Sequence, residues 1–229
     1  MGKNRRKYAI STKGIIPARR DTPFTYYSKL EDFFERGVDI ESRILYIGTA
    51  HFSEDGDDLG VDARMAEYAI KGLHILNESG KDPIRVFINT PGGNISDGWA
   101  IYDAIMASSS PVAIEVYGEA SSMGSIILQA GDLRLMHPKA IVMVHDGYNQ
   151  NTERMPTRSH ESWGDWSKRE RKRMYELFSK RSGRSISYWE RRCAHDSVID
   201  AHETVKVGLA DKVIEYPSRI FYNIRRNSH

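Results

Sequence analysis

Cysteine is nearly absent from this sequence: Cys193 is the only one among 229 residues. A single thiol cannot form a disulfide within the chain, and this cysteine usage fits a reducing compartment. Long apolar runs are missing too, and none approaches the roughly 20 residues of a membrane-spanning helix. The basic start, MGKNRRKYAIST, is not followed by the apolar segment of a secretory signal. We therefore expect a cytoplasmic protein that does not enter a membrane.

An excess of charge of one sign is also missing, because 33 basic residues face 31 acidic ones and the net charge is +2. This small charge argues against a dedicated nucleic-acid binder. The basic run 168–173 belongs to a predicted helix with interspersed acids, so we interpret it as a solvated or subunit-facing surface. The acidic run 54–58 resembles a calcium loop only in composition and lacks the spaced ligands, so we expect no metal site there.

In the middle of the chain, apolar runs typical of strands alternate with segments whose apolar spacing is helical. This alternation predicts an α/β fold with a mostly parallel, buried sheet and right-handed crossovers. A basic arm at 1–24 and a basic tail at 217–229 flank it. The predicted strands are 43–47, 84–89, 112–117, 133–136, 140–145 and 212–215. The predicted helices are 61–77, 95–106, a helix after Ser122 that includes 126–130, 159–181, 186–193 and 202–207.

The segment 118–125, GEASSMGS, joins a predicted strand to a predicted helix and consists mainly of small residues. A nucleophilic serine at such a turn needs a small residue two positions before it and a glycine two positions after it. Ser122 meets this requirement with Ala120 and Gly124, whereas Ser121 and Ser125 do not. The alternative is that Ser121 or Ser122 only caps the helix.

Two further segments end predicted strands. The glycines of Asn89-Thr90-Pro91-Gly92-Gly93 can let the backbone approach a ligand and present N–H groups, although a simple tight turn explains them as well. His145 follows the run 141–144, where an imidazole could accept a serine proton near neutral pH. A strand-end histidine without a role is the alternative. Composition alone does not choose an acid to orient this imidazole.

Together these segments resemble the proteolytic subunit of the Clp protease, the ClpP family of self-compartmentalised serine peptidases. The similarity covers roughly residues 40 to 215, and no single motif carries it. The segments that carry it are INTPGGNISDGWAIYDAI, GEASSMGSIILQAG, AIVMVH, RMYELFSKRSGRSISYWERRCAHD and AHETVKVGLADKVIE.

The resemblance implies a role for particular residues. Ser122 would be the nucleophile, His145 the base and Asp196 the orienting acid; Asp196 rests on the alignment, with Asp200 and Asp211 as its near competitors. The backbone N–H groups of Gly93 and Met123 would stabilise the oxyanion. Gly92, Gly147, Tyr148 and Asn149 would contact the substrate, and the chemistry would need no metal or organic cofactor.

The resemblance also implies an architecture. Residues 25–216 would form a ClpP/crotonase-type spiral of βαβ units, with a projecting handle helix within about 146–183. The subunits would form a homo-oligomer, a heptameric ring or a stacked tetradecamer, that encloses the active sites. Peptides or unfolded proteins would bind as extended strands, with an ATPase of the Clp type as a possible partner. We expect no nucleic-acid or membrane partner.

The chain departs from the family pattern in places. Ala194 and His195 occupy positions where the family has an acid–arginine pair, and the Gly-Gly of the handle loop is reduced to Gly147. Residues 1–24 show no clear match to the family's axial-pore segment. The alternatives are therefore a specialised processing protease without an ATPase, such as a viral head-maturation protease, a crotonase-type acyl-CoA enzyme, and a catalytically silent ring subunit.

Overall fold

The computed structural model describes residues 33, 36–48, 60–147 and 156–216. The basic arm, the acidic loop and the basic tail expected from the sequence lie outside the described residues, as do Tyr148 and Asn149. Within the described residues, none of the helices combines the length and apolar character needed to cross a membrane.

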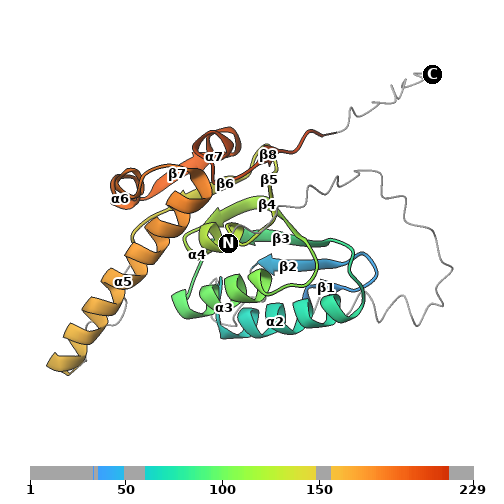
Figure 1. Ribbon diagram of the computed structural model, residues 1–229, viewed down its shortest axis with the longest axis horizontal. Helices are drawn as coiled ribbons and strands as arrows, with labels where there is room; N and C mark the ends of the chain where they lie inside the picture. Colours follow the sequence, from blue (N-terminus) through green and yellow to red (C-terminus); the bar gives the residue numbers. More distant parts are fainter. Residues whose placement is uncertain (1–32, 34–35, 49–59, 148–155, 217–229) are drawn as a thin grey trace, which may run out of the picture.

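An eight-stranded, mostly parallel sheet forms the centre of the described structure (Figure 1). Strands β2, β3, β4 and β5 are parallel neighbours, and β8 extends the sheet beyond β5. The antiparallel pairs are β1–β2 and β6–β7. The bounds are β1 Val38–Asp39, β2 Ile44–Gly48, β3 Ile84–Thr90, β4 Val112–Ser121, β5 Leu133–Met136, β6 Ile141–Val144, β7 Ser197–Asp200 and β8 Lys212–Val213.

Strand β4 belongs to two branches of the sheet. Residues 113–116 pair with β5, whereas residues 119–121 pair with β6. Gly118 lies between the two branches with φ +53°, and a Cβ there would come within 2.3 Å of Asn89 Oδ1. Only glycine fits this backbone. The division of β4 allows the chain to wind from one branch of the sheet to the other.

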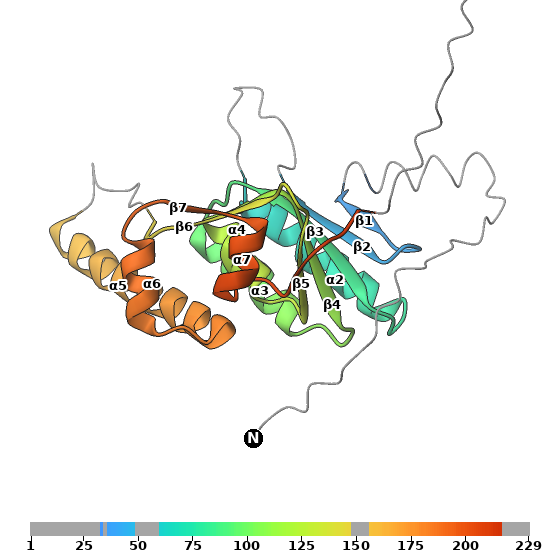
Figure 2. The ribbon, with the colours of Figure 1, turned by 90° about the horizontal axis from the view of Figure 1, so that it is seen from above.

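Helices α2 and α3 lie along one face of the sheet (Figures 1 and 2). Helix α2 buries Met65, Ala69, Leu73 and Leu76, whose spacing forms one helical stripe. The helix bounds are α2 Ala63–Glu78, α3 Ile95–Met106, α4 Met123–Leu128, α5 Thr157–Ser182, α6 Ile186–Cys193 and α7 Ala201–Val207.

Helix α5 projects from the body of the molecule (Figure 1). It ends at Gly183, which has the left-handed conformation that stops helices. Toward this end α5 buries Met174, Tyr175 and Phe178, and Phe178 packs on Trp189 of α6.

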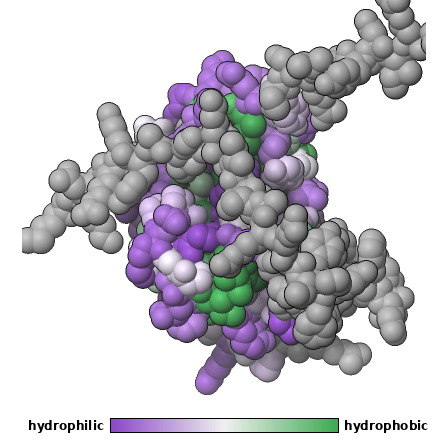
Figure 3. All heavy atoms as spheres, turned by 90° about the vertical axis from the view of Figure 1, so that its right-hand side faces the viewer, coloured by the Kyte–Doolittle hydropathy of each residue, from purple (hydrophilic) through white to green (hydrophobic). Residues whose placement is uncertain are grey.

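On the face seen in Figure 3 the described surface is mainly hydrophilic, with hydrophobic side chains gathered in small, separate areas. The buried apolar side chains form one core, which lies under α2, α3 and the last turns of α5.

The α/β class and the projecting helix agree with expectation, whereas the short strand β1 was not predicted and several bounds differ by one or two residues. Strand β4 continues to Ser121, beyond the predicted end at Tyr117, because residues 119–121 still pair with β6. Strand β7 was not predicted from the sequence, and it forms because the segment after Asp196 pairs antiparallel with β6. The pairing of β7 with β6 matters for the candidate site.

Candidate active site

Three strand ends bring the sequence-predicted residues to one edge of the sheet. Strands β3, β4 and β6 are parallel, so their carboxyl ends lie on the same side. Crevices for ligands open at such ends in α/β sheets. The glycine pair follows β3, Ser122 follows β4, and His145 follows β6.

The backbone of Ser122 has an unusual conformation, with φ 50° and ψ −117°. Such a conformation costs on the order of 1–3 kcal/mol and persists only where the surroundings hold it. The Ser122 N–H donates to the Met143 carbonyl at 2.8 Å, and the Ser122 carbonyl accepts from the N–H and the hydroxyl of Ser125 at 3.0 and 2.6 Å. The Ser122 hydroxyl makes no capping bond to α4, so it is available for another partner.

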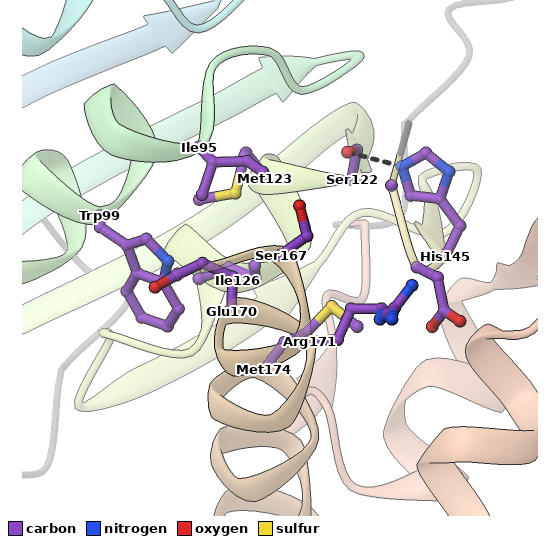
Figure 4. A pocket seen from close by; sticks show the side chains of 12 residues that line it. Ile95, Trp99, Ser122, Met123, Ile126, His145, Ser167, Glu170, Arg171 and Met174 are labelled. Carbon is purple, nitrogen blue, oxygen red and sulfur yellow. Dashed lines mark hydrogen bonds between the residues drawn. The ribbon is translucent and has the colours of Figure 1, made fainter. Parts of the chain in front are cut away.

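That partner is His145 (Figure 4). The Ser122 Oγ lies 2.8 Å from His145 Nε2, and His145 Nδ1 lies 3.2 Å from Asp196 Oδ1. The His145 side chain is 10% exposed and that of Asp196 is 56% exposed. An imidazole that donates from Nδ1 to a carboxylate can accept the serine proton at Nε2. The three side chains therefore form a linear array suited to general-base activation of a hydroxyl.

Strand β7 explains why Asp196 lies beside His145. Val144, the last residue of β6, is paired with Ser197, the first residue of β7. The residues just outside this pair, His145 and Asp196, consequently face each other. The Asp146 N–H also donates to the Cys193 carbonyl at 2.9 Å, which holds the two chain segments together past the strand ends.

The two competing acids are engaged elsewhere. Asp200 is the N-cap of α7 and accepts from the Glu203 N–H. Asp211 pairs with Arg134 at 2.7 Å. Burial alone would raise the pKa of Asp211, but the hydrogen bonds and charge of Arg134 outweigh it and lower that pKa below its usual value. Of these acids, Asp196 is the one in contact with His145.

The glycine pair approaches Ser122 closely. A Cβ on Gly92, which has φ +103°, would lie 2.6 Å from Ser122 Cβ and 3.0 Å from the Met123 nitrogen. Gly93 forms a parallel bridge with Val61, in which the Gly92 carbonyl and the Asn94 N–H bind Val61. In such a ladder the Gly93 N–H points to the opposite side, away from Val61. Met123 begins α4, where backbone N–H groups lack helical acceptors.

A pocket opens beside Ser122 and His145, and its walls come from three helices (Figure 4). Its apolar wall is formed by residues of α3, α4 and α5, while polar side chains of α5 lie along one side. The lining residues are Ile95, Trp99, Ser122, Met123, Ile126, His145, Asp146, Gly147, Ser167, Glu170, Arg171 and Met174. Of the predicted substrate contacts, Gly147 lines this pocket and Gly92 lies against Ser122. No sequence pattern indicated the α5 residues of this pocket, because the fold alone brings that helix to the site.

Two buried residues near the site, Tyr175 and Cys193, are not among the predicted site residues. Tyr175 of α5 donates its hydroxyl to the Asp146 carboxylate. Burial, together with this hydrogen bond, raises the pKa of Tyr175, so its phenol stays protonated. Cys193 is fully buried, which raises the pKa of its thiol to about 12 and keeps it from acting as a thiolate. Among the described residues, no three His, Cys, Asp or Glu side chains are grouped so as to hold a metal ion.

Comparisons with known proteins agree with this architecture. ClpP1 from Listeria monocytogenes, solved as a point mutant, has a similar structure with a TM-score of 0.67 and 24% sequence identity. The similarity covers 77% of this chain and 94% of the Listeria chain. The family model described as Clp protease matches residues 58–217. This match spans well over half of the sequence, and the chain belongs to the Clp protease family.

Proposed function

We propose that this member of the Clp protease family is a serine endopeptidase that hydrolyses peptide bonds through Ser122, His145 and Asp196. The observation that carries the proposal is the pair of contacts at His145, 2.8 Å to the Ser122 hydroxyl and 3.2 Å to the Asp196 carboxylate. The unusual backbone of Ser122 supports it, because strained residues that the surroundings hold in place cluster at active sites.

The mechanism follows from these contacts. His145 Nε2 takes the hydroxyl proton while the Ser122 oxygen attacks the peptide carbonyl carbon. Asp196 holds the tautomer with the proton on Nδ1 and stabilises the imidazolium that forms. The oxyanion of the tetrahedral intermediate accepts hydrogen bonds from the N–H groups of Gly93 and Met123. His145 then protonates the leaving amine, and water activated by the same imidazole hydrolyses the acyl-enzyme.

The neighbouring pocket would receive the substrate side chain that precedes the cleaved bond. Trp99, Met123, Ile126 and Met174 give it a largely apolar wall, and all four are buried. An apolar side chain would lose its contact with water there, which stabilises binding by about 25 cal/mol per Å² of apolar surface. We therefore expect cleavage after large apolar residues.

We further propose that residues 25–216 act as the peptidase domain, with 146–183 as its handle, and that copies assemble into a heptameric ring or a stacked tetradecamer. Membership of the Clp protease family supports the oligomer. A chamber of this kind would admit peptides and unfolded proteins, delivered by a Clp-type ATPase. If purified ATPase partners of this class do not stimulate cleavage of a folded, tagged protein, a processing protease without an ATPase is the better assignment.

The central test is the variant Ser122→Ala, which keeps the fold but removes the nucleophilic oxygen. Cleavage of an unstructured fluorogenic peptide is expected to fall by on the order of 10⁴-fold or more. A serine-directed phosphonate should label the wild type once per chain, and mass spectrometry should locate the label on Ser122. Full cleavage by the purified variant would overturn the mechanism. Binding of an acyl-CoA without phosphonate labelling would point instead to a crotonase-type enzyme.

A further inference from the structure

The segment that carries His145 leaves the sheet immediately. Strand β6 ends at Val144, and the next described residues, His145, Asp146 and Gly147, have no regular secondary structure. Backbone outside a ladder needs other contacts to hold one conformation. On one side, the Asp146 N–H donates to the Cys193 carbonyl at 2.9 Å. On the other side, the Asp146 carboxylate accepts a hydrogen bond from the hydroxyl of Tyr175.

Tyr175 is suited to hold this segment. Its side chain is 8% exposed and belongs to the apolar core at the base of α5, so the ring has little freedom. Its neighbour Met174 lines the pocket beside Ser122. Hydrogen bonds to a charged acceptor are about twice as strong as those between neutral groups. The contact between Tyr175 and Asp146 thus joins the rigid base of a helix to the residue directly after His145.

The exposure of Asp196, the acid partner of His145, is a further reason for an anchor such as the contact of Tyr175 with Asp146. The Asp196 side chain is 56% exposed, and contacts between groups that water surrounds are weak. The exposed carboxylate therefore contributes little to holding the ring, although the His145 side chain itself is only 10% exposed. The backbone on which the ring is carried needs its own support.

We propose that Tyr175, acting through Asp146, is a positioning residue that keeps the His145 imidazole aligned with both Ser122 and Asp196. This inference rests on the proposed function and adds a residue of α5 to the hydrolytic machinery. It makes the projecting helix a determinant of turnover as well as of substrate binding. The contact is made by a side-chain hydroxyl, so its removal can be separated from the packing of the aromatic ring.

The experiment uses Tyr175→Phe in the full chain, assayed with a fluorogenic peptide. A misplacement of about 1 Å in an active site can cost roughly 100-fold in rate, and we expect kcat to fall about 10- to 100-fold with KM changed less than about threefold. The rate of phosphonate labelling of Ser122 should fall in parallel, because that reaction also needs the imidazole. Asp146→Ala should behave like Tyr175→Phe. Asp146→Asn should lose less activity than Asp146→Ala, since its amide oxygen still accepts the phenol proton.

The matched control is Tyr188→Phe, which removes the hydroxyl of a partly buried tyrosine of α6 that accepts a hydrogen bond from Arg192 at 2.9 Å. It should retain wild-type kcat. The double variant Tyr175→Phe/Asp146→Ala should be no slower than either single variant, because both remove the same contact.

A Tyr175→Phe protein that melts like the wild type and keeps kcat within about twofold would overturn the inference. So would additive losses in the double variant. Failure of the proposed function can be distinguished from failure of this inference. If the proposed function is wrong, the Ser122→Ala protein assayed in parallel will remain active. If Tyr175→Phe does not fold, the comparison of Asp146→Asn with Asp146→Ala decides the question.

Discussion

At the scale of single residues, Gly92 and Ser122 approach each other so closely that no side chain fits between them. A Cβ on Gly92 would lie 2.6 Å from Ser122 Cβ and 2.7 Å from the Ser121 carbonyl oxygen, and the residue has φ +103°. Real Cβ atoms do not tolerate such contacts, and the conformation itself disfavours residues other than glycine. The backbone at 92 therefore packs directly against Ser122 and the Met123 nitrogen.

We expect Gly92→Ala to lower kcat/KM for a peptide by at least about 100-fold, because a displacement near 1 Å is enough for such a loss. The matched control is Gly164→Ala in α5, where a new Cβ would meet nothing within 4 Å. That change should leave activity intact and raise the free energy of unfolding by about 0.5–1 kcal/mol. Peptide hydrolysis measures the activity of each variant, and thermal unfolding measures its stability. An active Gly92→Ala enzyme would contradict the close approach.

The residues differ in how far the sequence could specify them. The spacing of small residues selects Ser122, and a strand-end position selects His145; their proposed roles remain predictions. Asp196 could not be selected from composition, because its place depends on the pairing of Val144 with Ser197 across two separate segments. Tyr175 gave no signal at all, since a tyrosine in a helix is ordinary core and only the fold brings its hydroxyl to Asp146.

At the scale of elements, α5 supplies one side of the pocket beside Ser122. Figure 4 shows the Ser167 hydroxyl directed from α5 toward the part of the pocket near Met123. Glu170, Arg171 and Met174 line the same pocket from this helix. A projecting helix thus helps to determine which side chain of a substrate can enter.

Replacing Ser167 by tyrosine should fill this space. We expect kcat/KM to fall about tenfold or more for peptides with leucine or phenylalanine before the cleaved bond, because lost apolar burial of one such side chain is worth about 1.5–3 kcal/mol. Peptides with alanine there should be affected much less. Ser162→Tyr, at an exposed position of the same helix, is the control. Equal losses with both kinds of peptide would show that the pocket does not select the substrate.

Regular elements with clear periodicity were predictable, and irregular ones were not. The helices at 95–106 and 186–193 begin and end where the apolar spacing indicated. Strand β7 was missed because only Ile199 of its four residues is buried, so it has no marked alternation. The end of β4 was misjudged because Gly118 and the small residues after it are typical of a turn, whereas pairing with β6 keeps them extended.

At the scale of the whole molecule, several large apolar side chains remain exposed on separate helices. The exposed fractions are 43% for Ile70 and 45% for Ile75 on α2, 56% for Met106 on α3 and 52% for Trp163 on α5. Scattered apolar residues are common on monomers. Their presence on both α2 and the projecting α5 is nevertheless compatible with contacts to other copies on two sides.

Native mass spectrometry tests the proposed assembly. We expect a particle of seven times the 26.1 kDa mass of the chain, or of fourteen times that mass if two rings stack. Ser122→Ala should give the same particle, because the Ser122 side chain lies in a pocket formed by its own subunit. Particles of a single chain at all micromolar concentrations, together with full peptidase activity, would contradict the ring.

The hydrogen bond from Ser122 to Met143 has a consequence for how the three side chains of the candidate site keep their spacing. Met143 and His145 are two residues apart at the end of β6, so thermal displacement of this short strand carries the serine and the imidazole together. The paired β7 carries the carboxylate along in the same way. Motions of β6 and β7 thus leave the spacing of these three side chains unchanged, whereas motions of α5 reach them through the contact of Tyr175 with Asp146.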